Sequence, residues 1–249
     1  MKRMKRLLLL LLAALPLMLS AKTPVEQDIL EQITDQTSPY YYTSLMMRYT
    51  TGDATMDDAA YHYLYYGYAY QESYKPLNSN PDMEQMLALM LHLDPDTTDE
   101  QLLETLLRTA DAARMRDPFS PKILNVMTFA CEKLGRKAEA EKWARHMNGI
   151  IRAIVASGDG WTQKSPQHIL MFDHALDVMA AEGLVHGKAR VISRTVEYIP
   201  LASPHHIDGK KRKGVYFDFG RIYWNKPEGY TYQRDRTWQF NNLKPREYK

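Results

Sequence analysis

The sequence contains a single cysteine, Cys131, among 249 residues, and one cysteine cannot form an intramolecular disulfide. A secreted domain without disulfides depends on its hydrophobic core, and a chain of this length can build one as one or two domains. Cys131 falls near the C-terminal end of an expected helix, where the helix dipole opposes a thiolate. We therefore expect Cys131 to be a buried hydrophobic side chain.

Neither basic nor acidic residues are in large excess. The chain has 32 basic and 30 acidic residues, a net charge of +2. Four basic residues, Lys2, Arg3, Lys5 and Arg6, lie at the N-terminal end, and without them 28 basic residues remain against 30 acidic ones, a net charge of −2. Nucleic-acid binding depends on a basic surface, so the composition predicts no nucleic-acid partner.

Only one long apolar run occurs, from Leu7 to Leu19. It covers about 13 residues, whereas a membrane-spanning helix needs about 20. The basic start before it and the small residues Ser20-Ala21 after it are typical of a secretory signal peptide. We expect removal of residues 1–21, a mature chain that begins near Lys22, and export to the periplasm or the exterior. No cysteine follows the run, so we expect no lipid anchor, and no membrane span after cleavage.

Motifs that carry known chemistry are equally scarce. No G-x-S-x-G nucleophile motif and no zinc-protease helix is present. His205-His206 and Asp208 have no second cluster at ligand spacing, so we expect a solvated loop rather than a metal site. His168 and His174 do not fit the i, i+4 spacing of a zinc helix, and we expect them to be partly exposed structural residues.

The acidic stretch at 94–99 is also explained without a ligand. Asp94, Asp96 and Asp99 lack the central glycine and the terminal glutamate of a calcium loop, and helix capping accounts for them better. We therefore expect no metal and no cofactor, and the sequence favours a protein that is not an enzyme. Paired carboxylates for glycoside hydrolysis meet only in three dimensions, so that activity stays open.

Apolar residues at helical spacing dominate the chain from 22 to 157. Thr55 with Asp58 and Thr98 with Gln101 resemble capping boxes, which predict that a helix starts just after each threonine. The pattern as a whole predicts helices at 23–36, 40–50, from 56 to at least 67, 82–93, 98–116, 121–134 and 138–156.

The middle of this helical region resembles a single degenerate tetratricopeptide unit. It has a helix, an Asp-Pro break, a second helix, a Leu-Gly turn and an alanine-rich helix, and small residues such as Ala138, Ala140 and Ala144 let neighbouring helices approach closely. At least three units are normally needed for a self-sufficient solenoid. The prediction is therefore a short helical stack.

The pattern changes after Gly158 and Gly160, which favour a tight turn. It predicts a helix at 173–182, a strand at 189–199, a polar loop at 203–214 with a solvated charge run at 210–213, a strand at 215–224 with a bulge at Gly220, and an edge strand at 237–240. The predicted fold is mostly α within the α+β class. A short tetratricopeptide-like helical stack at 22–157 precedes a small α+β module with antiparallel strands at 158–249, packed on the helices as one unit.

Several stretches together resemble one protein family, the secreted domain-of-unknown-function family 4919 of Bacteroidales-type bacteria. The matching stretches run in order from Ser38 to Tyr223: SPYYYTSLMMRYTTGD, YHYLYYGYAYQESYKP, DPFSPKILNVM, LGRKAEAEKWARHMNGI, ASGDGWTQKSPQHIL and GVYFDFGRIY. The resemblance implies a secreted bacterial protein of one compact fold. It implies no activity and no functional residues, because the family has none assigned.

Tyrosine is concentrated in one segment, with seven tyrosines among the fourteen residues from 61 to 74. A capping signal before this segment favours a helix that is broken near Gly67, and apolar residues on both faces indicate an inner, packed helix. Tyrosine hydroxyls need a partner when buried or point to water. A carbohydrate or peptide groove is the alternative, and its candidate ligand-binding residues are Tyr63, Tyr66, Tyr70 and Tyr74.

Helical stacks offer concave surfaces to peptides and proteins. We therefore expect a non-enzymatic exported binding or scaffolding protein of the bacterial cell envelope, with a protein or peptide partner there. Two alternatives remain open, an envelope hydrolase of glycan or peptide and a glycan-binding accessory protein. The sequence predicts no oligomeric state.

Overall fold

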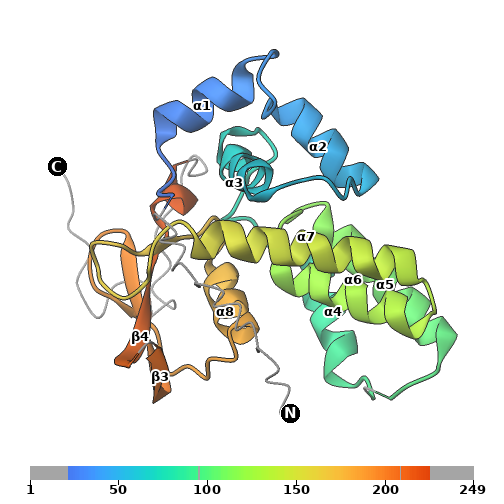
Figure 1. Ribbon diagram of the computed structural model, residues 1–249. Helices are drawn as coiled ribbons and strands as arrows, with labels where there is room; N and C mark the ends of the chain where they lie inside the picture. The colour runs from blue at the N-terminus through green and yellow to red at the C-terminus, as the bar shows by residue number, and fades with distance from the viewer. Residues whose placement is uncertain (1–21, 95, 208, 225–249) are drawn as a thin grey trace, which may run out of the picture.

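A computed structural model describes residues 22–94, 96–207 and 209–224 (Figure 1). The expected signal peptide and the expected edge strand at 237–240 lie outside these residues. The helices and strands are α1 (Glu26–Thr34), α2 (Tyr42–Thr51), α3 (Asp58–Gly67), η1 (Tyr68–Tyr70), α4 (Pro81–Leu91), α5 (Glu100–Arg114), α6 (Pro121–Lys133), α7 (Lys137–Val155), β1 (Gln167–His168), α8 (Phe172–Ala181), β2 (Arg190–Val191), β3 (Val196–Ile207), β4 (Lys210–Asp218) and η2 (Gly220–Tyr223). This mostly helical α+β architecture confirms the predicted fold class.

The third helix starts later than predicted because a different residue caps it. Asp57 accepts a hydrogen bond from the amide of Ala60 at 2.8 Å and is the N-cap of α3. Thr55, the expected cap, instead donates from its amide and its hydroxyl to Oδ1 of Asp53, at 2.8 and 2.6 Å. The helix ends at Gly67 and continues as the short 3-10 helix η1, so the predicted break near Gly67 is confirmed.

Helices α4 to α6 each begin at a side-chain cap. Asn80 caps α4 and Ser120 caps α6, and each helix has a proline as its first residue, where a missing amide costs nothing. The prediction that Thr98 caps α5 is wrong, because Asp99 is the N-cap and its side chain accepts a hydrogen bond from the amide of Leu102 at 3.1 Å. Aspartate is at least as good an N-cap as threonine, so the helix starts one residue beyond it.

Helices α4 to α7 pack in chain order, α4 on α5, α5 on α6 and α6 on α7. Their shared cluster contains Cys131, which is fully buried. Burial raises the pKa of its thiol to about 11, so the thiolate is scarce at neutral pH. The prediction of a buried hydrophobic cysteine is confirmed.

A four-stranded sheet follows in the order β1-β4-β3-β2. β3 pairs antiparallel with β2 and β4, as predicted for this module, whereas β1 pairs parallel with β4. The polar loop expected at 203–214 is wrong, because β3 runs to Ile207 and β4 begins at Lys210, with Gly209 at φ 74° in the turn. Both faces of this hairpin end carry polar side chains, so the sequence there has no hydrophobic alternation.

The predicted bulge at Gly220 is wrong as well. The alternation slips there because the chain leaves β4 and forms η2, in which the amide of Ile222 donates to the carbonyl of Phe219 at 3.0 Å. The charge run at 210–213 also differs from expectation. Arg212 is buried beside the Trp161 ring, 5.5 Å from its centroid, and Nη1 lies 3.4 Å from Oε2 of Glu182.

The long helix α7 lies at the centre of the molecule, between α1–α3 on one side and α8 with the β3–β4 hairpin on the other (Figure 1). It packs against α3, α6, α8 and β1. One hydrophobic cluster joins buried residues of α1–α3, α7, α8, the sheet and η2, so these helices and the sheet share a core, whereas most of the buried apolar residues of α4–α6 belong to the cluster around Cys131. In the part of the chain that is described, no helix is long and apolar enough to cross a membrane.

Candidate functional site

The tyrosine-rich helix α3 is an inner helix, packed against α1, α2 and α7. Its tyrosine hydroxyls are bonded within the protein. The hydroxyl of Tyr61 lies 2.9 Å from Nδ1 of His146 in the interior. Gly149 lets α7 approach so closely that a Cβ there would meet the Tyr61 ring at 2.5 Å. The prediction of a packed, apolar helix is therefore confirmed.

Three of the four tyrosines proposed to line a groove are buried. Tyr63 donates to Oδ2 of Asp28 at 3.1 Å, and Tyr66 and Tyr74 are fully buried. The hydroxyl of Tyr66 donates to the carbonyl of His168 at 2.9 Å, and that of Tyr74 donates to the carbonyl of Leu170 at 2.8 Å. These hydroxyls connect α3 and the segment after η1 to the chain around β1.

Tyr70 is the fourth candidate and differs from the others, because it is only half-buried. Its ring centroid lies 5.4 Å from that of the exposed Trp224. Together with part of Tyr74, it lines a surface cavity whose other described lining residues are Gln71, Glu72, Lys75, Leu77 and Asn78. Of the four proposed residues, Tyr70 therefore has the most accessible ring.

The loop between α5 and α6 is held by tyrosines from two other helical segments. The hydroxyl of Tyr49 donates to the carbonyl of Pro118 at 2.7 Å, and that of Tyr68 donates to the carbonyl of Arg116 at 3.3 Å. Phe119, fully buried, packs edge-on against the rings of Tyr49 and Tyr68, with centroids 5.3 and 5.2 Å apart. Asp117 lies between these two bonded carbonyls, so the hydrogen bonds to Arg116 and Pro118 fix the backbone on both sides of it.

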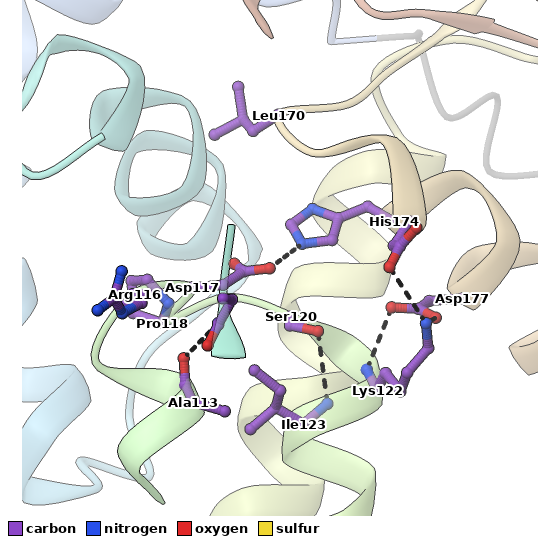
Figure 2. Close-up of polar contacts among 12 residues, drawn as sticks. Ala113, Arg116, Asp117, Pro118, Ser120, Lys122, Ile123, Leu170, His174 and Asp177 are labelled. Carbon is purple, nitrogen blue, oxygen red and sulfur yellow. Dashed lines mark hydrogen bonds and ion pairs between the residues drawn. The ribbon is translucent and has the colours of Figure 1, made fainter. Parts of the chain in front are cut away.

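A chain of buried hydrogen bonds ends at Asp117. The amide of Leu170 donates to the hydroxyl of Tyr65 at 3.0 Å, and this hydroxyl lies 2.8 Å from Nδ1 of His174. Nε2 of His174 lies 3.2 Å from Oδ2 of Asp117, as Figure 2 shows. Three segments that are distant in sequence, around residues 65, 117 and 170–174, therefore meet at these bonds.

The charge of Asp117 shapes the ionisation of His174. Burial lowers the pKa of this imidazole most, but the charge and hydrogen bond of Asp117 together with the charges of Asp177 and Asp173 outweigh that effect. The net result is a pKa above the usual value for histidine. The imidazole itself is 1% exposed, so it acts on the surface only through Asp117.

Asp117 stands between this interior chain and the surface. Its side chain is 13% exposed. Its Oδ1 is buried and has no hydrogen-bond partner among the residues that the structure describes, and an unpaired buried carboxylate oxygen is costly.

A second charged group lies on the other side of His174. Nζ of Lys122 lies 3.5 Å from the carboxylates of both Asp173 and Asp177. The Lys122 amide donates to Oδ2 of Asp177 at 3.2 Å (Figure 2). Burial raises the pKa of Asp177 even though Lys122 and His174 oppose the shift. These contacts join the start of α6 to α8 and hold the wall of the site.

A surface cavity of about 440 Å³ opens at Asp117. Three segments line it, the stretch from 73 to 87, residues 115–117 at the end of α5, and residues 171–173 at the start of α8. Its apolar lining residues are Met83, Leu87, Met115, Met171 and Phe172, and its charged lining residues are Lys75, Glu84, Arg116, Asp117 and Asp173. We call this cavity, defined by these lining residues, the α4–α8 cavity.

Exposed apolar side chains extend this cavity along α4. On α4, Leu87 is 41% exposed and Leu91, one turn beyond it, is 79% exposed. Met115, the residue directly after α5, is 73% exposed. Side chains four residues apart share one face of a helix, so Met83, Leu87 and Leu91 form a stripe. The cavity thus combines an apolar edge with a carboxylate whose position the interior determines.

The structure brings other predicted residues to different places. His205 and His206 lie exposed on β3, and among the described residues no group of three or more His, Cys, Asp or Glu side chains has the geometry of a metal site. His168 is partly exposed, as predicted, but the same expectation for His174 is wrong, because α8 turns it into the core.

Sequence reasoning also missed the pairing of Asp117 with His174. The two residues are 57 positions apart, and no spacing rule links residues at that separation. The Asp-Pro pair was visible only as a helix stop. The sequence offered one signal for Asp117, its position in the short connection between two predicted helices, because loops carry a disproportionate share of binding residues.

The comparison with protein families gives a clear result. A profile described as domain of unknown function (DUF4919) matches residues 27–227, so the chain belongs to this family. No curated protein and no solved structure shows a significant match to the chain.

Proposed function

We propose that this chain is an exported, non-enzymatic binding protein of the bacterial cell envelope, and that the α4–α8 cavity holds a peptide segment of a protein partner. The single observation that carries the proposal is the composition of this cavity. It places an exposed apolar stripe beside charges of both signs, among them the carboxylates of Asp117 and Asp173.

A peptide segment satisfies this surface better than a purely apolar ligand does. Backbone amides and basic side chains donate hydrogen bonds to carboxylates, which Asp117 and Asp173 provide. Apolar side chains of the same peptide cover Leu87 and Met115. Ligand sites typically combine mostly apolar walls with a few placed polar groups, and this cavity has both.

The interior chain supports binding rather than hydrolysis. A general base must come within hydrogen-bond reach of the proton that it removes. His174 is 1% exposed, and each of its ring nitrogens already faces a protein partner, the hydroxyl of Tyr65 or the carboxylate of Asp117. The imidazole therefore holds Asp117 in place and does not reach a ligand in the cavity.

Site-specific photocrosslinking in cells tests the proposal. A benzophenone amino acid replaces the exposed Leu87 in the cavity, and a matched variant carries it at Met47, which is 64% exposed on α2. We expect the Leu87 variant to form one discrete adduct with an envelope protein and the Met47 variant to form none. A synthetic peptide from the crosslinked segment should then bind the wild-type protein and bind Leu87→Asp at least tenfold more weakly.

Equal adducts from both positions, or a peptide that binds wild type and Leu87→Asp equally, would contradict the proposal. Leu87 is exposed, so its replacement by aspartate leaves the core intact. An unfolding midpoint equal to that of the wild type confirms that any loss of binding is local.

A glycan ligand is the second candidate, and the cavity at Tyr70 favours it. Sugars bind on aromatic ring faces with amide and carboxylate groups at their edges, and Tyr70 shares its cavity with Gln71, Glu72 and Asn78. Calorimetric titration with soluble envelope oligosaccharides tests this candidate. Binding that is lost in Tyr70→Ala and kept in Leu87→Asp would support it, and heats no larger than dilution would contradict it.

A further inference from the structure

The first described residues lie along the C-terminal end of α7. The backbone nitrogen of Lys22 donates to the carbonyl of Ala156 at 2.7 Å. The hydroxyl of Thr23 donates to the carbonyl of Ser157 at 3.3 Å, and the carbonyl of Pro24 accepts from Nη2 of Arg221 at 2.8 Å. Three consecutive residues are therefore bonded to two places in the fold, the end of α7 and Arg221.

The partner of Lys22 is a helix end. Ala156 is the C-cap of α7, a helix of 19 residues. The last carbonyls of a helix have no intrahelical donor, and the helix dipole makes this end negative. A positive charge at the end of a helix stabilises it. The backbone nitrogen of Lys22 lies where such a charge would act.

We propose that proteolytic cleavage between Ala21 and Lys22 creates this charge, and that the new N-terminal ammonium group binds the C-terminal end of α7. Water adds across the Ala21–Lys22 peptide bond, the leader leaves with the carboxylate of Ala21, and the nitrogen of Lys22 becomes an α-ammonium at neutral pH. The amide hydrogen bond to Ala156 then becomes charge-assisted, and such bonds are roughly twice as strong. This inference rests on the proposed export.

The side chain of Lys22 also has a contact in the fold. Its Nζ lies 4.3 Å from the centroid of the Tyr63 ring. The position of Tyr63 is set by its hydrogen bond to Asp28 and by stacking on Tyr40, with ring centroids 4.4 Å apart. The first residue of the mature chain is thereby held at its backbone and at its side chain.

The bonds of this segment also connect two parts of the fold. Arg221 of η2 is buried, and its Nη1 lies 3.3 Å from Nδ1 of His168. Through Pro24 and Arg221, the segment before α1 reaches the end of the sheet. The mature N-terminus therefore joins α7 to η2, which explains why a residue at the expected cleavage point is anchored.

Two measurements test the inference. The full-length chain, expressed with its own leader and recovered from the envelope fraction, should have an intact mass that corresponds to Lys22 as the first residue. A different first residue would overturn the proposal. Lys22 does not line the α4–α8 cavity, so a different first residue would leave the photocrosslinking test at Leu87 unaffected.

The second measurement isolates the charge. Three forms of the mature protein are compared by thermal unfolding: one with a free amine at Lys22, one acetylated at that α-amine by semisynthesis, and one extended by the natural residues Ser20-Ala21. We expect the free form to have a midpoint about 1–4 °C above the other two. The difference should shrink at about 1 M salt, because salt screens the charge.

Lys22→Ala is the matched control, since it removes Nζ and keeps the α-ammonium. Its free and acetylated forms should still differ by about the same amount. Equal midpoints for the free, acetylated and extended forms would overturn the proposed role of the ammonium group.

Discussion

The hydroxyl of Tyr65 lies 2.8 Å from Nδ1 of His174, although the two residues are 109 positions apart in the chain. The same hydroxyl accepts the amide hydrogen of Leu170 at 3.0 Å. A phenylalanine would fill the same space without making either bond. Much of the tyrosine density in this segment is explained by bonds of this kind, because the four tyrosine hydroxyls of α3 each connect the helix to a distant segment.

Replacement of this hydroxyl should destabilise the protein strongly. Tyr65→Phe leaves the Leu170 amide and one nitrogen of His174 buried without their partner, and each unpaired buried group costs about 1–3 kcal/mol. We expect a loss of about 2–4 kcal/mol in the free energy of unfolding, measured with urea.

Tyr63→Phe is the matched control for this change. It removes a hydroxyl that bonds to the half-buried Asp28, where water can replace the lost partner. We expect a loss below about 1 kcal/mol. Equal losses for Tyr63→Phe and Tyr65→Phe would show that the buried chain at Tyr65 does not contribute as a unit.

The pair of His174 and Asp117 should make stability depend on pH in a known direction. The pKa of His174 in the folded protein is above its usual value of 6.5. Its contribution to stability is therefore fully present below pH 6.5 and is lost as the pH rises through the folded pKa. The free energy of unfolding of His174→Gln should fall further below that of the wild type at pH 6 than at pH 8.5.

Ring titration by NMR checks the cause of this shift. We expect His174 to titrate above pH 6.5 in the wild type and at lower pH in Asp117→Asn. Asp111→Asn changes an exposed carboxylate that pairs with Arg114, and it should leave the titration unchanged. A His174 that titrates below pH 6.5 in the wild type would refute the assignment.

The helical part of the fold was largely predictable because its signals are local. Apolar spacing, proline at the first turn and polar capping residues lie within a few positions of each other. The starts of α3 and α5 were misplaced because a threonine and an aspartate close by both make good caps. Only the tertiary structure shows which one, Thr55 or Asp57, is free to turn toward the helix.

The hairpin end and the site were less predictable, for two different reasons. The sequence at the end of the β3–β4 hairpin is mostly polar, so no period of apolar residues marks the strands there, although an Asp-Gly pair in a sequence is a recognised hairpin signal. The pairing of Asp117 with His174 joins a loop to a helix across the core. Local sequence rules contain no information on such a contact.

Gly149 in α7 provides a test of packing against helix propensity. Alanine in a helix interior is normally favoured over glycine by about 1 kcal/mol. A Cβ at Gly149, however, would lie 2.5 Å from the Tyr61 ring, and this ring is held by the contact with His146. We expect Gly149→Ala to lower the free energy of unfolding by about 1–3 kcal/mol.

Gly187→Ala is the control for this substitution, because the nearest atom to its new Cβ would be Cγ of Pro200 at 3.3 Å. We expect its stability to stay within about 0.5 kcal/mol of the wild type. Stabilisation by Gly149→Ala would show that the Tyr61 ring moves and that α3 and α7 are packed less tightly than the structure indicates.

Glu197 on β3 should reduce stability at neutral and alkaline pH. It is buried, and burial raises its pKa from 4.5 to about 7. Folding therefore favours the protonated form, so stability is full below pH 4.5, falls as the pH rises toward 7 and then levels off. The shift corresponds to about 3 kcal/mol, and Glu197→Gln removes the charge. We expect this variant to match the wild type at pH 4 and to exceed its free energy of unfolding by up to about 3 kcal/mol at pH 8.

Glu132→Gln is the control, at an exposed position on α6, and its free energy of unfolding should show no pH-dependent gain over the wild type. If Glu197→Gln gained the same free energy of unfolding at pH 8 as at pH 4, the assignment would be contradicted.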